Sequence, residues 1–285
     1  MLKTVTEITS LGQISQLYDI ILCDVWGVLH NGIKLFPDSI DALQKARLNG
    51  LKVILLTNSP RPSSSVISHI KALGSSQIFW DDMITSGDLT YHLITKESPK
   101  IFFIGPARDH VLLEGLNIKI VDEKDAETIV CTGLYNDETE TPEEYYMLLQ
   151  RFARRKVPFI CANPDIVANR GDKIIPCAGA LAKIYQQLHG NVKMIGKPHF
   201  PIYEMALKKI SVLCHSSNKK RILAIGDGIE TDIKGALKAE LDTLYVSRGI
   251  HMHEYLTHDQ IDVPMMHNFF RKKNLYPHWW IQQLI

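Results

Sequence analysis

An apolar segment from Tyr18 to Cys23 runs directly into Asp24, within the string CDVWGVLHNG. A carboxylate at the end of a buried strand is a candidate nucleophile, because covalent catalysis by aspartate splits one difficult displacement into two easier ones. Two residues later the chain carries Trp26, whose indole has a single weak donor and no basic atom at neutral pH. The sequence therefore offers a nucleophile whose near neighbour cannot exchange protons.

A hydroxyl and an amide end a second apolar strand, in the string LLTNS from Leu55 to Ser59. In open parallel sheets, ligands bind outside the carboxyl ends of the strands, so Thr57 and Asp24 are expected to face the same crevice. This places a hydrogen-bond donor beside the candidate nucleophile. Taken alone, however, a strand that ends in Thr-Asn is more often an ordinary turn.

A lysine flanked by glycine and proline, Lys197 in IGKPHFPIYEMAL, stands at the entrance to a predicted helix. A cation in this position can hold a phosphoryl group and the aspartate that attacks it. The string Gly-Lys-Pro is weak evidence by itself, because most lysines are simply solvated on the surface.

Two carboxylates, Asp227 and Asp232, follow the apolar strand ILAIG in the string GDGIETD. Magnesium prefers one or two carboxylates together with waters and substrate phosphate, a set that Asp24 and Asp227 can supply. The alternative is that Asp227 and Asp232 are turn and helix-cap residues.

Apolar runs bounded by turn signals alternate with segments of helical period, a pattern typical of a parallel sheet covered on both faces. We predict strands over 19–23, 52–57, 100–104, 128–132, 159–162, 221–225 and 243–246, helices over 37–48 and 66–73, and a final helix that packs Trp279 and Trp280 against the body. The predicted fold class is therefore α/β.

Composition excludes several classes of function. The 285 residues carry 32 basic and 31 acidic side chains, without the basic excess of a nucleic-acid-binding protein. No apolar run reaches the roughly 18 residues that cross a bilayer, and the first residues lack the apolar segment of a signal peptide. Five cysteines without a CxxC pair suit a reducing compartment, so we expect a cytoplasmic protein without nucleic-acid or membrane partners.

The order and combination of these four segments resemble the haloacid dehalogenase (HAD) superfamily. The strings TSGDLT, CANPD, PCAGALAKI and GDGIETDIKGALKAE are similar to its class IIA branch of sugar and small-metabolite phosphatases, over about residues 18 to 250. The resemblance implies a Rossmann-like core domain, 1–85 and 190–285, with an inserted α/β cap domain of the C2 type, 86–189. The sequence leaves open whether the chain forms a homodimer through its cap, as such caps can.

The resemblance also implies roles for the matching residues. Asp24 would be the nucleophile that forms an aspartyl-phosphate on a small phosphorylated substrate, and Thr57 and the backbone around Asn58 would bind the phosphoryl group. Lys197 would neutralise charge on that group. Mg²⁺ would be bound by Asp24, Asp227 and the backbone carbonyl of Trp26, while Asp232 would orient the lysine or a metal-bound water.

Trp26 replaces the aspartate that, in this family, protonates the leaving group and later activates water. General acid-base catalysis is worth roughly 100- to 10,000-fold, so we expect slow turnover of alkyl phosphates. His30 is a candidate substitute, against its alternative as a solvent-exposed loop histidine. Two further hypotheses remain: a catalytically degenerate protein that binds a phosphorylated metabolite, and redirected chemistry such as cleavage of a carbon–phosphorus or carbon–halogen bond.

Substrate specificity is expected to depend on the cap and on the loop after Thr57. There, Ser59 and Arg61 are candidate contacts to a second anionic group, although Arg61 can equally be a solvated surface residue. On the cap, Asn163 and Asp165 are candidates for hydrogen bonds to a polyol or are an ordinary turn. We interpret His251 and His253 as surface loop residues rather than metal ligands.

Overall fold

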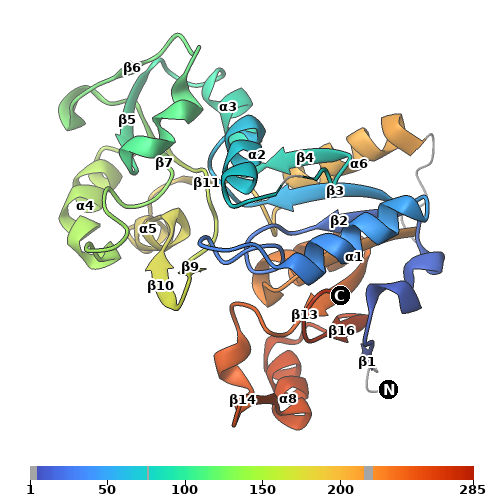
Figure 1. Ribbon diagram of the computed structural model, residues 1–285. Coiled ribbons are helices and arrows are strands. Elements are labelled where there is room, and N and C mark those ends of the chain that lie inside the picture. The colour runs from blue at the N-terminus through green and yellow to red at the C-terminus, as the bar shows by residue number, and fades with distance from the viewer. Residues whose placement is uncertain (1–4, 76, 215–220) are drawn as a thin grey trace. The chain divides into compact units, whose positions relative to one another are not determined.

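The computed structural model describes residues 5–75, 77–214 and 221–285. The chain divides into two compact units, each described here by itself: Met1–Leu56, Lys71–Ile84 and Tyr203–Ile285 form the first, and Thr57–Ile70 and Thr85–Ile202 form the second (Figure 1). The division into a core domain of 1–85 and 190–285 and a cap domain of 86–189 stays a prediction.

The first unit is built on a seven-stranded sheet with the order β1-β16-β13-β12-β2-β3-β4. Its strands are β1 (Thr6–Glu7), β2 (Ile20–Cys23), β3 (Lys52–Thr57), β4 (Asp82–Thr85), β12 (Ile222–Gly226), β13 (Asp242–Val246) and β16 (Trp279–Ile281). Its helices include α1 (Pro37–Leu48), most of α6 (Phe200–Cys214), the π-helical turn η7 (Ile229–Ile233), α7 (Lys234–Lys238) and α8 (Val263–Lys273). Two short strands, β14 (Leu256–Thr257) and β15 (Gln260–Ile261), form a separate antiparallel hairpin.

The central strands of this sheet are parallel and almost entirely buried. The register places Cys23 of β2 opposite Ile225 of β12 on one side and opposite Leu55 of β3 on the other. All residues of β2 and β12 are buried, as expected for strands covered on both faces. Because these parallel strands end at the same edge, the residues that follow β2 and β12 are brought together there.

The second unit contains a five-stranded parallel sheet with the order β11-β8-β7-β5-β6. The strands are β5 (Lys100–Ile104), β6 (Lys119–Ile120), β7 (Thr128–Cys131), β8 (Phe159–Cys161) and β11 (Val192–Met194), and β9 (Val167–Arg170) pairs with β10 (Lys173–Pro176) in an antiparallel hairpin. The helices are α2 (Ser63–Ala72, in part), α3 (Ser86–Ile94), the 3-10 helix η3 (Ala107–Leu113), α4 (Tyr146–Arg154) and α5 (Ala178–Gln187).

Alternating residues of β7 pack into two different hydrophobic clusters. Ile129 belongs to a cluster with Phe152 of α4 and Leu181 of α5. Val130 belongs to a second cluster with Leu112 of η3. Since successive side chains of a strand point to opposite faces, this sheet is covered on both sides, and the α/β fold class is confirmed.

The predicted final helix over Trp279 and Trp280 is wrong. These residues form β16, which pairs in parallel with β1 and β13, and Trp280 is only 2% exposed. The last helix is α8, which ends where Asn274 adopts a left-handed conformation at φ 52°. A strand of three residues has no readable period, so only its distant partners reveal it.

The other predicted elements agree closely with the structure, except that the helix predicted over 66–73 is α2, which begins three residues earlier, at Ser63, and ends at Ala72. The strands over 52–57 and 100–104 and the helix over 37–48 have the predicted bounds, and the remaining strands differ by one residue at one or both ends. Four buried cysteines take part in no disulfide bond, namely Cys23, Cys131, Cys161 and Cys177, while the side chain of Cys214 lies outside the described residues. Within the described part of the chain, no helix is long and apolar enough to cross a membrane.

Asp81 links α1 to β3 through hydrogen bonds, and its substitution can show how much this link stabilises the first unit. Its carboxylate accepts hydrogen bonds from Arg47 Nε (3.1 Å), from Arg47 Nη2 (3.0 Å) and from the backbone N–H of Val53 (2.8 Å). Burial raises the pKa of Asp81, but these hydrogen bonds and the charges of Arg47 and Lys52 outweigh it, so the pKa lies below its ordinary value. Asp81 therefore stabilises the fold when it is ionised.

We predict that Asp81→Asn lowers the free energy of unfolding at pH 7 by about 1–3 kcal/mol, since charge-assisted hydrogen bonds in a partly buried site are lost. A group whose pKa is depressed by folding loses its contribution as pH falls, so the difference from the native protein should shrink between about pH 5 and pH 2. Urea unfolding across this range measures it. The control Asp41→Asn removes an exposed pair with Lys45 and should change stability little; equal losses in both variants would contradict the prediction.

Candidate functional site

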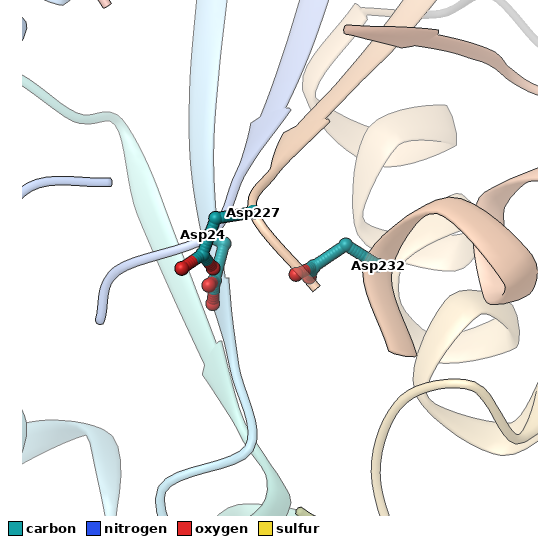
Figure 2. A group of neighbouring side chains, drawn as sticks. All are labelled: Asp24, Asp227 and Asp232. Carbon is teal, nitrogen blue, oxygen red and sulfur yellow. The ribbon is translucent and has the colours of Figure 1, made fainter. Parts of the chain in front are cut away.

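Three aspartates gather at the carboxyl edge of the first unit's sheet. Asp24 follows β2, Asp227 follows β12, and Asp232 lies in η7. Each is buried, and each offers a carboxylate oxygen within 4.8 Å of those of the other two. Figure 2 shows Asp24 and Asp227 pointing in the same direction, with Asp232 pointing toward them from its helical turn.

Asp227 is held in place by the backbone around it. Its Oδ2 accepts a hydrogen bond from the N–H of Ile250 at 2.7 Å. A Cβ atom added to Gly27 would lie 2.1 Å from Asp227 Oδ2, and one added to Gly249 would lie 2.2 Å from the same oxygen. Because neither position has room for a side chain, two loops enclose this carboxylate and fix its direction.

Asp232 is fixed by the loop that joins β12 to η7. Its Oδ2 accepts a hydrogen bond from the N–H of Gly228 at 2.9 Å. A Cβ atom at Gly226 would lie 2.3 Å from Asp232 Cγ, so this turn also requires a residue without a side chain. The hydroxyl of Tyr203 donates to the backbone carbonyl of Asp232 at 3.2 Å and anchors it to α6.

The donor set of this cluster fits a hard divalent cation. Carboxylates this close repel one another in a buried site, and a cation bound by oxygen ligands offsets that repulsion. Oxygen ligands without sulfur or nitrogen are the set that Mg²⁺ prefers. The aspartates therefore fit Mg²⁺, with Asp24 and Asp227 extending directly from adjacent strand ends.

The loop after Asp24 is shaped around the indole of Trp26. Trp26 and His30 form a β-bridge, and their ring centroids lie 5.0 Å apart with an interplanar angle of 69°. Gly32 has φ 86°, and a Cβ atom added there would lie 2.5 Å from the Trp26 ring. The indole thus packs edge-to-face against the His30 ring and occupies the space that a side chain at Gly32 would need, so Trp26 is part of the packing of this loop.

The interpretation of His30 as a solvent-exposed loop residue is wrong. The residue is only 1% exposed, and its Nδ1 accepts a hydrogen bond from the N–H of Gly32 at 3.0 Å. Its backbone carbonyl also accepts from the N–H of Gly27 at 2.8 Å. His30 thus holds the turn that carries Trp26.

The second unit contains Thr57, Asn58 and Lys197, all of which are buried. Asn58 Oδ1 accepts from the N–H of Lys197 at 2.7 Å, and Asn58 Nδ2 donates to the Lys197 carbonyl at 3.1 Å. Gly196, at φ 120°, has no room for a Cβ atom, which would lie 2.5 Å from Asn58 Oδ1. The Asn58 side chain therefore fixes the backbone of Lys197, a role that the sequence did not suggest.

Asp165 belongs to the same network. Its Oδ1 accepts a hydrogen bond from Asn58 Nδ2 at 2.8 Å, while its N–H donates to Asn163 Oδ1 at 3.1 Å. The sequence offered these two residues as polyol contacts or as an ordinary turn. The hydrogen bond within Asn163–Asp165 is that of a turn, and Asp165 supports Asn58.

Ser59 and Arg61 continue the loop after Thr57. The N–H of Ser59 donates to Thr57 Oγ1 at 3.2 Å, and the N–H of Arg61 donates to Ser59 Oγ at 3.4 Å. The Arg61 side chain is partly buried, with 24% of its surface exposed, so both alternatives for it stay predictions.

His251 lies in a turn, as interpreted from the sequence, but its side chain is only partly exposed. Its ring lies 5.2 Å from that of Phe269, and burial lowers its pKa to about 4. The neighbouring His253 is exposed as expected.

Two segments of the chain match models of known protein families. Residues 21–119 match the model of haloacid dehalogenase-like hydrolases, and residues 194–267 match a second, HAD-hydrolase-like model. The chain is 26% identical to ribonucleotide monophosphatase NagD of Escherichia coli K12, over 81% of this chain and 88% of that protein. It is 22% identical to an acid sugar phosphatase of Staphylococcus aureus, over 82% and 88% of the two chains.

A solved structure gives stronger evidence. The crystal structure of a haloacid dehalogenase-like family hydrolase from Brucella suis 1330 is 45% identical, with a TM-score of 0.88, and covers 98% of this chain and 100% of that chain. The likeness therefore extends over both units. Together with the buried aspartates at the strand ends, it shows that the chain belongs to the haloacid dehalogenase-like hydrolase family, as the sequence resemblance predicted.

Proposed function

We propose that the protein is a Mg²⁺-dependent phosphatase that hydrolyses a small phosphorylated metabolite through an aspartyl-phosphate on Asp24. The observation that carries this proposal is the cluster of Asp24, Asp227 and Asp232, three buried carboxylates with oxygens within 4.8 Å of one another. The names of the curated relatives, a ribonucleotide monophosphatase and an acid sugar phosphatase, support a small phosphate monoester as the substrate.

Each residue has a defined task in the proposed reaction. Asp24 attacks phosphorus, and the bond to the leaving oxygen breaks as the aspartyl-phosphate forms. Thr57 and the backbone around Asn58 bind the phosphoryl oxygens, Lys197 neutralises their charge, and water then releases phosphate and restores Asp24. Mg²⁺, bound by Asp24, Asp227 and the Trp26 carbonyl, supplies charge neutralisation between the two anions when it is present.

Asp232 and Asn58 are positioning residues in this proposal. Asp232 is fixed by the N–H of Gly228 and orients a metal-bound water or the lysine. Asn58 holds both the N–H and the carbonyl of Lys197, so the ammonium group extends from a fixed backbone. Preorganised charge of this kind stabilises a transition state without reorganisation during the reaction.

Trp26 sets the limit on the rate. The indole cannot protonate an alkoxide leaving group or activate water, and loss of general acid-base catalysis costs about 10²- to 10⁴-fold. For substrates whose leaving groups need no proton, such as aryl or acyl phosphates, the rate of the first step should be reduced less.

The packing of the indole against His30 and Gly32 also favours a second candidate function, that of a protein that binds a phosphorylated metabolite without turnover.

We predict that the protein releases phosphate from p-nitrophenyl phosphate only with Mg²⁺, and that Asp24→Asn lowers the rate by at least about 10³-fold because the nucleophile is lost. Colorimetric assays with and without EDTA measure this. Asp19→Asn is the matched control, since Asp19 precedes the same strand and pairs with Arg221 at the surface. Activity that survives in Asp24→Asn would overturn the mechanism.

We predict that Trp26→Asp raises the turnover of an alkyl phosphate such as glycerol 3-phosphate by about 10²- to 10⁴-fold, and that of p-nitrophenyl phosphate much less. Trp26→Phe is the control, because it keeps an apolar ring without supplying a carboxyl group. Steady-state phosphate release from both substrates, with circular dichroism to verify folding, measures the effect. If the native protein is inactive and Trp26→Asp is active, the second candidate function, binding without turnover, is favoured. If the native protein, Trp26→Asp and Trp26→Phe are all folded and have equal rates, the indole does not limit turnover.

A further inference from the structure

Arg61 carries a partly buried charge whose guanidinium has only a long contact with one carboxylate. Its side chain is 24% exposed, and its nearest carboxylate oxygen, Asp109 Oδ1, lies 3.9 Å from Nε, beyond hydrogen-bond distance. Among the residues that the structure describes, no acceptor lies within hydrogen-bond range of its guanidinium, which has five N–H donors. None of its nitrogens is a fully buried atom without a partner, so these donors reach solvent, and an oxyanion can replace water there.

Asp109 does not offset this charge fully. The residue lies in η3, is 4% exposed, and burial raises the pKa of its carboxyl group despite the charges of Arg61 and Arg108. Its ionised form is therefore costly, and it contacts Arg61 through one oxygen at 3.9 Å instead of through a bidentate pair.

Two further arginines lie near enough for their charges to lower the pKa of Arg61, although burial is the larger cause. Arg170 donates to both oxygens of Asp137, at 3.0 and 2.7 Å, and Arg108 donates to the same carboxylate. One largely buried aspartate thus serves two arginines. Glu138 adds a contact to Arg170 at 3.3 Å, but its side chain is 58% exposed and its charge is screened by water.

The position of Arg61 relates this charge to the phosphoryl-binding loop of the same unit. Thr57 and Arg61 are four residues apart, a separation that spans at most about 14 Å even in a fully extended chain. The hydrogen bonds from Ser59 to Thr57 and from Arg61 to Ser59 keep the loop locally folded. The backbones of Thr57 and Arg61 therefore belong to one short folded loop, and Arg61 is the arginine of that loop.

We propose that Arg61, assisted by Arg108 and Arg170, binds a second oxyanion of the substrate, a carboxylate or a second phosphate, while the phosphoryl group to be transferred is bound at Thr57 and Lys197. This inference rests on the proposed function and narrows its substrate class to metabolites with two anionic groups. A guanidinium matches such a group geometrically, because it presents two parallel N–H donors to one oxyanion.

The test compares ligands that differ only in the second group. In Asp24→Asn, which prevents turnover, isothermal titration calorimetry with Mg²⁺ measures the dissociation constants of 3-phosphoglycerate and glycerol 3-phosphate, and of fructose 1,6-bisphosphate and fructose 6-phosphate. We expect the dianionic member of at least one pair to bind at least about 10-fold more tightly, and the pair that shows it identifies a carboxylate or a phosphate. Arg61→Gln should bring that ratio close to one, whereas Arg151→Gln, which removes an exposed arginine paired with Glu123, should preserve it.

Asp109→Asn is a second variant, needed because Arg61→Gln could lose the ligand preference simply by misfolding. Because it removes the carboxylate that competes for Arg61, it should increase the preference for the dianionic ligand several-fold. Binding of the monoanionic phosphates with no preference, or a preference that Arg61→Gln does not change, overturns the inference and leaves the proposed function standing. No binding of any phosphate in the native protein or in Asp24→Asn, together with no phosphate release, overturns both.

Discussion

Electrostatic repulsion among three buried carboxylates is the constraint on which the rest of the first unit depends. Asp24, Asp227 and Asp232 carry like charges within a few ångströms of one another, out of contact with most of the solvent. Such an arrangement is stable only if rigid backbone holds it and a cation offsets it. Adjacent parallel strands provide the first condition, because β2 and β12 are paired up to Cys23, the last residue of β2, opposite Ile225 of β12.

The glycines near this cluster follow from the same constraint. Gly27, Gly226 and Gly249 each stand where a Cβ atom would overlap an aspartate side chain. Backbone that approaches so closely shields the carboxylates from water and supplies N–H donors in place of solvent, as Ile250 does for Asp227. The second unit uses the same device at Gly196, which lets Asn58 reach both polar groups of the Lys197 peptide.

Local sequence signals predicted the fold class and the central strands of both sheets. The strand Lys52–Thr57 and the helix Pro37–Leu48 have clear periods and terminal signals, so their bounds could be predicted to the residue. The strand Trp279–Ile281 could not, because its existence depends on pairing with β1 and β13, from distant parts of the chain. Conversely, the preference of Mg²⁺ for carboxylates was enough to predict that Asp24 and Asp227 come together, and the structure places them within one cluster.

The parts of the site that sequence did not reveal depend on contacts between distant residues. Nothing near Asn58 in the chain indicates that its amide bonds to Lys197 and Asp165, more than 100 residues away. The weak pairing of Arg61 with Asp109 is likewise visible only in three dimensions. His30 was expected in an exposed loop, whereas its ring contacts that of Trp26 and its Nδ1 accepts a hydrogen bond from the N–H of Gly32, contacts that its neighbours in the sequence do not reveal.

The contact between Trp26 and Gly32 also has a historical consequence. Any residue with a Cβ atom at position 32 would overlap the indole and, at φ 86°, would be strained as well. In this loop conformation, a chain with another residue at position 32 could accept the indole at position 26 only if it gained the glycine first or at the same time. The two positions are epistatic, and chains of this family that carry the tryptophan should carry the glycine too.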